Sequence, residues 1–289
     1  MVNNTYNSDH CWQYEVRKRN FQRDLVSHNL TIDIVKNLRV SDFTFKNIIE
    51  KSEQQHLKEF IEENEWLGNL SQYTTHWFGC YYSDILAGAI LFNMPNAFSK
   101  LLGEDTKNLE RLISRGACIS WSPKNLASSF LMWCIKWMVK NTDFRLFFGY
   151  SNPIAKELGT IYQACGFYYL GQSAGATSMY INPYNGKIVS DRYFRQKVAF
   201  KKYAEELGIA WQDNWQDKWA VDWKNVPEDI EKKLREYSRF KQQNSERIDI
   251  PRKHKYVYIL GKDKRETKYL RKLFESKNKI YPYPKERGK

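Results

Sequence analysis

The sequence predicts an α/β fold, with a mixed central sheet flanked by helices and a mostly helical, basic C-terminal extension. Patterns typical of strands and helices follow one another between residues 76 and 182, in the order strand, strand, strand, helix, strand, helix, strand. Hydrophobic residues make up 42% and charged residues 27% of the 289 residues, so the chain can bury a substantial core. Basic residues gather toward the C-terminus, which sets that part apart from the core.

The individual elements follow from residue spacing and turn signals. Residues 1–30 are polar and mixed, and we expect a loosely packed arm there. Apolar residues at helical intervals predict a helix over 43–63, and HWFGCYYSDILAGAILF predicts two strands joined at Ser83-Asp84. The later core elements are expected to be a strand over 111–121, helices over 126–142 and 154–167, and strands over 143–151 and from 168.

Four parts are expected along the chain. They are an arm and first strand at 1–42, a catalytic core at 43–182, a helical insertion or satellite subdomain at 183–250, and a returning strand, basic helix and tail at 251–289. The segment KYVYILG at 255–261 alternates in character, so we expect it to return and complete the sheet. Tryptophans at 211, 215, 219 and 223 would form one stripe on a helix, either packed in a core or stacked on unpaired bases.

The charge of the chain points to a polyanionic partner. The net charge is +13, and the last 39 residues hold 14 basic and 4 acidic side chains. Such asymmetry favours a polyanionic partner, most simply nucleic acid; a solvated basic tail is the alternative. The predicted phosphate contacts lie on one basic helix, at Lys262, Lys264, Arg265, Lys268, Arg271 and Lys272.

The cysteines and the hydropathy pattern indicate a cytoplasmic protein. The five cysteines are scattered and form no C-x-x-C pair, which is typical of reduced thiols. No run reaches eighteen apolar residues, so no membrane span is expected. The first twenty residues contain no apolar region of the secretory type.

A turn between a predicted strand and a predicted helix could hold a phosphate. Ser122-Pro123-Lys124-Asn125 precedes the helix, whose first turn offers N–H groups and positive dipole density. Arg115 and Lys124 add positive charge, and Ser128 adds a hydroxyl. An ordinary connection, with Pro123 as the helix starter, explains the same residues. The Walker A and G-x-G-x-x-G patterns are absent from the sequence, which disfavours a nucleoside triphosphatase or a Rossmann domain.

The next segment resembles the second half of the GCN5-related N-acyltransferase (GNAT) superfamily. It carries Ile161-Tyr162-x-x-x-Gly166-Phe167 before a new strand, as that superfamily carries Leu-Tyr-x-x-x-Gly-Phe. The resemblance implies acyl-CoA binding by the preceding strand and helix, with Tyr162 protonating the departing thiolate. A phenol with a pKa near 10 suits that role, whereas a purely structural aromatic is the alternative.

A narrower resemblance, over about 63–171, is to the phage Mom-type DNA-modification proteins. The matching pieces are NEWLG at 64–68, FGCYYSDILAGAILFNMPNAFSKLLG at 78–103, RLISRGACISWSPKNLASSFL at 111–131 and SNPIAKELGTIYQACGFYYLG at 151–171. The resemblance implies transfer of a carbamoylmethyl-type group to adenine in DNA, which protects phage DNA from restriction. It also implies acetyl-CoA or another CoA derivative as cofactor and double-stranded DNA as partner. If a phage encodes the chain, it implies a location in the bacterial host cytoplasm.

The resemblance assigns roles to particular positions. Tyr162, Asn152, Glu65 and Asn64 are the expected catalytic residues, with Glu65 the best candidate base among the neighbouring glutamates. The expected cofactor contacts are Arg115, Cys118, Ile119, Ser120, Lys124, Asn125 and Ser128. This chain has Asn64 and Asn152 where the family commonly has His and Asp, and neutral Asn is a poor ligand for a transition metal. Use of a metal is therefore left open.

Two other functions remain compatible with the sequence. One is a GNAT-like N-acyltransferase that acts on a protein or a small amine. The other is a non-catalytic DNA-binding protein on a GNAT scaffold, which Asn64 and Asn152 favour. The group transferred, the base and its sequence context, and the oligomeric state do not follow from the sequence.

Overall fold

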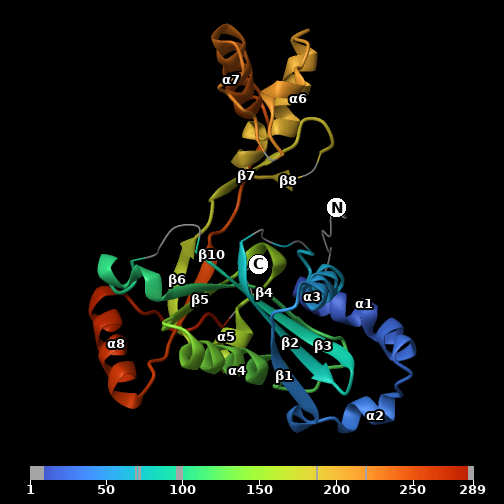
Figure 1. The fold of residues 1–289 in the computed structure, drawn as a ribbon, viewed down its shortest axis with the longest axis vertical. Helices are drawn as coiled ribbons and strands as arrows, with labels where there is room; N and C mark the ends of the chain where they lie inside the picture. Colours follow the sequence, from blue (N-terminus) through green and yellow to red (C-terminus); the bar gives the residue numbers. More distant parts are fainter. Residues whose placement is uncertain are drawn as a thin grey trace. The chain divides into compact units, whose positions relative to one another are not determined.

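The computed structural model describes residues 10–68, 70, 73–95, 100–186, 188–218 and 220–285, apart from the side chains of 105–107. The chain divides into two units, of which one is Gly175–Pro251 and the other is formed by the segments on either side of it. Figure 1 labels the elements of both units. The flanking segments build the larger unit, which contains all the residues predicted from the sequence to act in catalysis.

The larger unit is organised around a seven-stranded sheet with strand order β1-β2-β3-β4-β5-β10-β6. All neighbouring strands are antiparallel except β4 and β5, which run parallel. The strands are β1 (Phe43–Ile48), β2 (Thr74–Tyr82), β3 (Ile85–Asn93), β4 (Glu110–Cys118), β5 (Leu146–Ser151), β6 (Tyr168–Ala174) and β10 (Lys253–Ile259). The predicted fold class, α/β with a mixed sheet flanked by helices, is confirmed. So is the return of 255–261 to the sheet, between β5 and β6.

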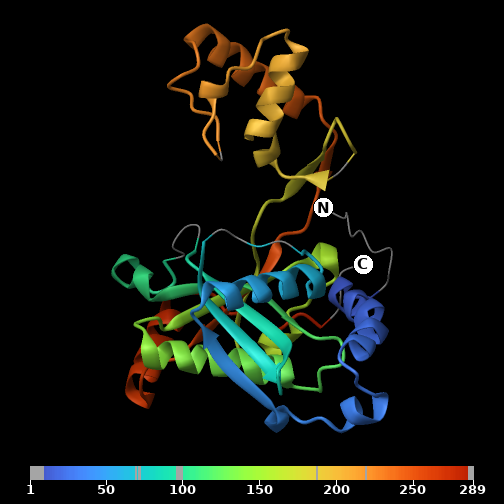
Figure 2. The ribbon, with the colours of Figure 1, turned by 45° about the vertical axis from the view of Figure 1, so that its right-hand side comes forward.

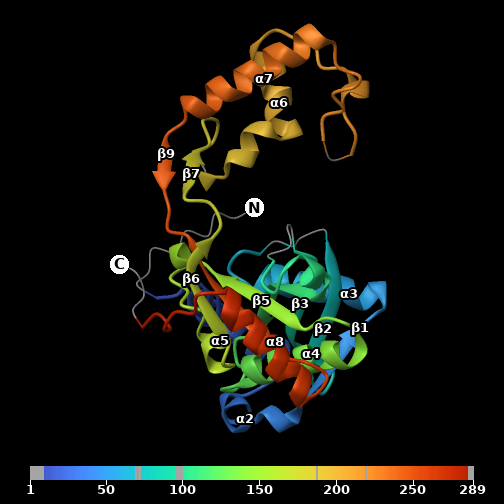
Figure 3. The same cartoon turned by 90° about the vertical axis from the view of Figure 1, so that its left-hand side faces the viewer.

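Helices cover both faces of this sheet, and Figure 2 shows α3 and α4 on opposite faces of β2 and β3. Figure 3 shows α8 against the half of the sheet that contains β5 and β10. Successive strand residues such as Phe147 and Phe148 point to opposite faces and belong to different apolar clusters. The larger cluster includes buried residues of both α3 and α4, and the smaller one includes Leu270 and Phe274 of α8. The helices of this unit are α1 (Trp12–Ser27), α2 (Ile32–Asn37), α3 (Lys51–Asn64), α4 (Leu126–Asn141), α5 (Thr160–Ala164) and α8 (Lys264–Lys277), with 3₁₀ turns at Val40–Asp42, Glu104–Leu109 and Pro153–Ala155.

The parallel pair β4–β5 opens partway along its length. Pairing runs from Glu110 opposite Leu146 to Ile113 opposite Gly149. Beyond that point β4 continues to Cys118 while it remains paired with β3, and β5 remains paired with β10 as far as Ser151. The two strands therefore separate toward their carboxyl ends, and the residues that follow on each are available to form a site.

Four local expectations were wrong. The segment 43–63 begins as strand β1 rather than a helix, because Phe43 and Phe45 alternate with polar residues and α3 begins only at Lys51. The helix expected over 154–167 is reduced to Thr160–Ala164, because Lys156 and Gly159 adopt positive φ and interrupt it. The strand expected over 111–121 forms as β4 but ends at Cys118, three residues before the expected end.

The fourth wrong expectation concerns the N-terminal arm. Within the described part of 1–30, residues 12–27 form helix α1, and its polar side chains Asn20 and Asp24 are buried. Asn20 donates a hydrogen bond to the Glu63 carbonyl at the end of α3, and Asp24 accepts one from Ser120. A buried polar group is tolerated when it is hydrogen-bonded, so polar composition does not imply loose packing here.

The smaller unit combines helices with a three-stranded sheet that the sequence did not predict. The tryptophan stripe expected on a helix does not form: Trp215 lies in a 3₁₀ turn, Trp211 and Trp223 lie outside helices, and Trp219 lies outside the described residues. Trp215 is buried and Trp223 packs edge-on against Phe200, which supports core packing for these two.

The elements of the smaller unit are β7 (Ser178–Ile181), β8 (Ile188–Val189), β9 (Arg247–Asp249), α6 (Lys197–Glu206) and α7 (Glu228–Gln243), with 3₁₀ turns at Asp191–Arg195 and Asp213–Trp215. Among the helices of the described residues, none is long and apolar enough to cross a membrane.

Candidate active site

The residue that follows α3 carries a buried carboxyl group. The helix ends at Asn64, and Glu65 takes an extended conformation that turns the chain toward β4. The Oε2 atom of Glu65 lies 3.3 Å from Nε of Arg115 on β4, just beyond the point where β4 and β5 part. This oxygen is buried and has no hydrogen-bond partner within the described residues. An unsatisfied buried carboxylate oxygen is costly, which is typical of a functional position.

A second carboxyl group, that of Glu157, joins the site from the loop after β5. Its Oε2 accepts the backbone N–H of Asn152 at 2.8 Å, and its Oε1 accepts the indole N–H of Trp66 at 2.8 Å. Glu157 therefore ties the segment after α3 to the carboxyl end of β5. The side chain of Asn152 accepts the backbone N–H of Ile154 at 3.1 Å, which fixes the start of the Pro153–Ala155 turn.

Burial controls the protonation of both acids. It raises the pKa of Glu65 to about 8, an effect that Arg115 opposes and the neighbouring Glu157 reinforces. Burial also raises the pKa of Glu157, against the hydrogen bonds from Asn152 and Trp66. Desolvation and the nearby Arg115 lower the pKa of the Lys253 ammonium on β10. Two acids and two cations thus converge, and Glu65 exchanges its proton close to neutral pH.

Tyr162 lies beside this charged cluster, on the short helix α5. Its ring stacks on Tyr256 with 5.2 Å between centroids, and its hydroxyl lies where a Cβ on Gly149 of β5 would be. Only glycine at position 149 leaves room for the phenol. Burial raises the pKa of Tyr162 above its usual value, and the charges of Glu157 and Glu65 raise it further. The phenol therefore keeps its proton at neutral pH and can act only as a proton donor.

The β4–α4 turn contains most of the predicted cofactor contacts, and several of these are occupied by bonds within the protein. The Ile119 N–H donates to the Ala87 carbonyl at 2.8 Å, and the Ser120 hydroxyl donates to Asp24 Oδ2 at 2.6 Å. Burial raises the pKa of Cys118 to about 12, so its thiol stays protonated. Lys124 remains exposed at the turn.

The start of α4 is compatible with an anion. Asn125 has a left-handed backbone, with φ of 65°, and the helix begins at Leu126. The Ser128 hydroxyl donates to the Asn125 carbonyl at 3.0 Å, on the first turn. The first backbone N–H groups of a helix have no partner within it, so this turn can bind a phosphate of a CoA-type cofactor.

The structure brings together four of the predicted residues and leaves others elsewhere. Glu65, Arg115, Asn152 and Tyr162 converge where β4 and β5 part. Asn64 faces α1 instead: its amide group donates to the Phe60 carbonyl at 3.0 Å and lies 3.4 Å from the Asn20 amide nitrogen.

Three residues of the cluster around Glu65 were not predicted from the sequence, namely Trp66, Glu157 and Lys253. Trp66 adjoins the predicted Glu65, so its position in the sequence was a usable signal. Glu157 is one of two charged residues on the helix predicted over 154–167, where a charged side chain is ordinarily solvent-exposed. Lys253 follows the inserted unit, so nothing in its sequence neighbourhood connects it to residues near 65.

The residues present do not fit a metal site. The amide of Asn152 caps a turn and that of Asn64 contacts α1, so neither points to a shared position. Across the part of the chain that the structure describes, no three His, Cys, Asp or Glu side chains are grouped to hold an ion.

Five of the six predicted DNA contacts share one surface. Lys262, Lys264, Lys268, Arg271 and Lys272 line a groove along α8 together with Tyr168 and Glu275. Arg265 does not line it. Lys262 lies 3.7 Å from Asp143, and Arg271 donates to the Ile259 carbonyl at 3.3 Å.

Comparisons with known proteins identify relatives of this chain. The sequence model of the Mom protein family matches residues 46–285. No curated protein sequence gives a significant match. Similar solved structures include an acetyltransferase from Bacillus subtilis in complex with CoA, with 9% identity, a TM-score of 0.35, and coverage of 75% of this chain and 99% of the other. Another is a GNAT family acetyltransferase from Elizabethkingia anophelis with acetyl-CoA bound, with 10% identity, a TM-score of 0.36, and coverage of 76% and 99%. Similarities with TM-scores this low say nothing about activity. The fold class follows from the strand order and pairing of the sheet.

Proposed function

The chain belongs to the Mom protein family, and from this premise we propose that it is an acyl-CoA-dependent transferase that modifies adenine in DNA. Attack of the adenine amine on the thioester would form an N–C(O) bond, break the C–S bond and release CoA, so the group transferred in this step would be acyl-derived. A carbamoylmethyl-like product would in addition require a nitrogen donor as a second co-substrate, and the modification would protect phage DNA from restriction. The observation that carries the proposal is the buried Tyr162 phenol, which stacks on Tyr256, packs against Gly149 and lies close to the carboxyl groups of Glu65 and Glu157. A site of this kind holds protons in place for a transfer reaction.

The β4–α4 turn is the proposed position of the cofactor phosphates. Lys124 is exposed there, and the first turn of α4 supplies N–H groups and positive dipole density. Cys118, Ile119, Ser120, Asn125 and Ser128 would shape this turn, and Arg115 would stand between it and the acids. When bound, the acyl-CoA would supply the acyl-derived group to be transferred.

The protein's own residues then manage the protons. Tyr162 holds a proton at its hydroxyl oxygen, which a departing thiolate can take. Glu65, with a pKa of about 8, can return a proton to the site or accept one. An adenine amine is barely basic, so positioning should contribute more than simple deprotonation. Asn152, through its backbone N–H, holds Glu157 in this arrangement.

The charge distribution supports DNA as the second substrate. Five basic side chains line one groove along α8, and this clustering suits contacts with successive phosphates. A protein or small-amine substrate would not require such a surface. Phosphate contacts of this kind give affinity without reading the base sequence.

Mass spectrometry of nucleosides tests the function directly. DNA from cells that express the chain should contain a modified deoxyadenosine, and DNA from cells that express Tyr162→Phe should contain far less. Calorimetry with CoA separates the alternatives. An N-acyltransferase for proteins or small amines would bind CoA and leave DNA unmodified. A non-catalytic DNA-binding protein would bind DNA without binding CoA, and either result would contradict the proposal.

A further inference from the structure

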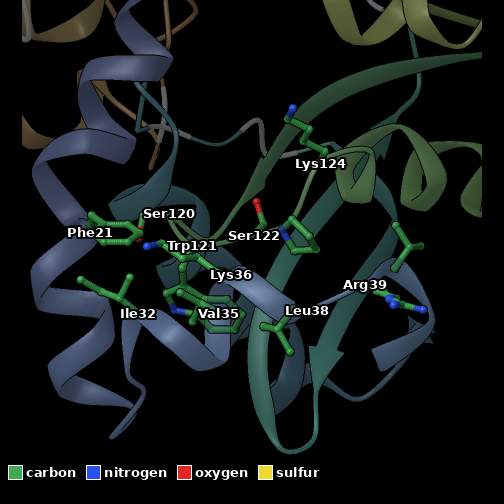
Figure 4. Close-up of a pocket in the computed structure, with 12 residues that line it drawn as sticks. Phe21, Ile32, Val35, Lys36, Leu38, Arg39, Ser120, Trp121, Ser122 and Lys124 are labelled. Atoms are coloured by element: carbon green, nitrogen blue, oxygen red, sulfur yellow. The ribbon is translucent and has the colours of Figure 1, made fainter.

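A pocket of about 580 Å³ lies beside the β4–α4 turn, away from the charged cluster at Glu65. Its walls come from α1, α2, the residues that precede β1, and the turn itself. Figure 4 shows apolar side chains of α1 and α2 on one side, and Arg39 and Lys124 on the other. A volume of this size is within the range of small-molecule sites.

Most of the residues that line this pocket lie in a part of the chain that the family match does not cover. Seven of its lining residues, from Phe21 to Val40, precede residue 46, where the match begins. The other five, from Ser120 to Lys124, belong to the turn within the match. The N-terminal segment therefore adds a cavity to the turn that is proposed to receive the cofactor phosphates.

Hydrogen bonds from α1 hold the shape of the pocket. Arg17 donates to the Ser120 carbonyl at 2.9 Å and to the Ser122 hydroxyl at 3.1 Å. The Ser120 hydroxyl donates to the buried Asp24 carboxylate at 2.6 Å. Because the first half of the turn, at Ser120 and Ser122, is fixed to α1, a ligand meets a largely formed site and loses little free energy in ordering it.

The lining combines apolar walls with positive charge. Phe21, Ile32 and Leu38 supply apolar surface, while Lys36, Arg39 and Lys124 supply the charge. These three cations are exposed and form no ion pair within the described ranges. None of the described lining residues is acidic. The complementary ligand is an anion that carries a flat apolar group.

We propose that this pocket binds a nucleoside phosphate. The base would lie against Phe21 and Ile32, and the phosphates would be held by the positive charges around the pocket. Lys36 lies on the side of Phe21, and Arg39 and Lys124 lie on the opposite side (Figure 4). Two sources carry this chemistry, the nucleotide end of CoA and a nucleotide of the DNA strand. CoA and DNA are ligands of this chain only under the proposed function, on which this part of the inference rests. Binding of a free nucleotide can be measured whether or not that function is correct.

Isothermal calorimetry with adenosine 3′,5′-bisphosphate tests the site on the full chain. We expect binding at millimolar concentrations or below, and a loss of at least about tenfold in affinity in Lys36→Gln/Arg39→Gln, because two charge-assisted contacts disappear. Ile32→Trp should weaken binding similarly by filling the cavity, with all charges kept. The matched control is Lys18→Gln/Lys51→Gln, which removes two exposed charges elsewhere and should bind normally. Circular dichroism verifies that each variant is folded.

Two further titrations distinguish the sources. If the pocket holds the nucleotide end of CoA, Lys36→Gln/Arg39→Gln weakens CoA binding and leaves affinity for a short single-stranded oligonucleotide unchanged. If it holds a nucleotide of DNA, the reverse result is expected. The proposal is overturned if no nucleotide binds the unmutated chain, or if the pocket variants and the control bind the bisphosphate equally. Because these are binding measurements, a chain that fails to modify DNA still gives a clear answer.

Discussion

The charges buried at Glu65 and the charges exposed along α8 act in different ways within one unit. Around Glu65, two acids, an arginine and a lysine interact over short distances, and burial raises the pKa of both carboxyl groups. Along α8, five cations line a groove in contact with solvent. Buried charges control where protons reside, whereas exposed charges supply additive and salt-sensitive affinity.

This difference predicts separable phenotypes. A single change in the buried cluster should stop the reaction while the ligands still bind. A single change on α8 should alter DNA affinity by a modest factor and leave the chemical step intact. The predictions below test that separation, from the largest expected effect to the smallest.

The largest effect is expected for Tyr162→Phe. The substitution keeps the ring that stacks on Tyr256 and packs against Gly149, and it removes only the hydroxyl group that carries the proton. Loss of a general acid typically costs about 10²–10⁴-fold in rate. Modified deoxyadenosine should form more slowly by about that factor, while the Kd values for CoA and DNA stay the same. Tyr14→Phe, at an exposed tyrosine, is the control; full activity of Tyr162→Phe would remove the proton-donor role.

The second effect concerns stability and pH. Glu65 keeps its proton up to about pH 8 in the folded protein, whereas the unfolded chain releases it near 4.5. The folded state therefore binds more protons between these values, so the free energy of unfolding falls as pH rises through this window, by at most about 1.4 kcal/mol per pH unit. Glu65→Gln should flatten this part of the profile in urea unfolding from pH 5 to 8.

Its control is Glu50→Gln, at an exposed glutamate before α3, which should leave the profile unchanged. If Glu65→Gln shows the same slope as the unmutated chain, the carboxyl of Glu65 is ionised at neutral pH. Glu65 could then not donate a proton at neutral pH, although its ion pair with Arg115 would remain.

Elements with strong local patterns were predictable from the sequence, and so was part of the site. The β2–β3 hairpin, α4, β10 and α8 follow from apolar spacing and turn residues, which act over a few residues. Glu65, Arg115, Asn152 and Tyr162 were named from motifs, and the fold brings them together. Glu157 was not predictable, because its role depends on a bond to Trp66 from a distant segment.

The N-terminal segment shows a second limit. The polar residues Asn20 and Asp24 indicated exposure, yet both are buried because their partners lie on α3 and on the β4–α4 turn. Patterns of composition report what a residue prefers on average. They do not report a hydrogen bond to a segment forty or more residues away, which is what fixes α1 in place.

A smaller effect is expected for Lys264→Gln/Lys268→Gln on α8. Both residues line the groove, so each should contact a phosphate and contribute about 0.9 to the slope of log K against log salt. Affinity for a duplex of any sequence should fall about tenfold at low salt, and the slope should decrease by nearly two. Filter binding or fluorescence anisotropy over a salt series measures both quantities. CoA affinity should not change, and an unchanged salt slope would place the DNA elsewhere.

The smallest effect is expected for Arg265→Gln, which removes a charge from the same helix outside the groove. Arg265 is exposed on α8 and does not line the groove that Lys264 and Lys268 line. If DNA follows the groove, Arg265 acts only through a screened, longer-range field, so affinity should fall by less than about twofold and the salt slope should stay the same. If the C-terminal charge acts merely as a diffuse cloud, Arg265→Gln should instead weaken binding as much as Lys268→Gln alone. Comparing these two single variants over one salt series decides between a defined phosphate path along α8 and a non-specific basic surface, because each removes one positive charge from one helix.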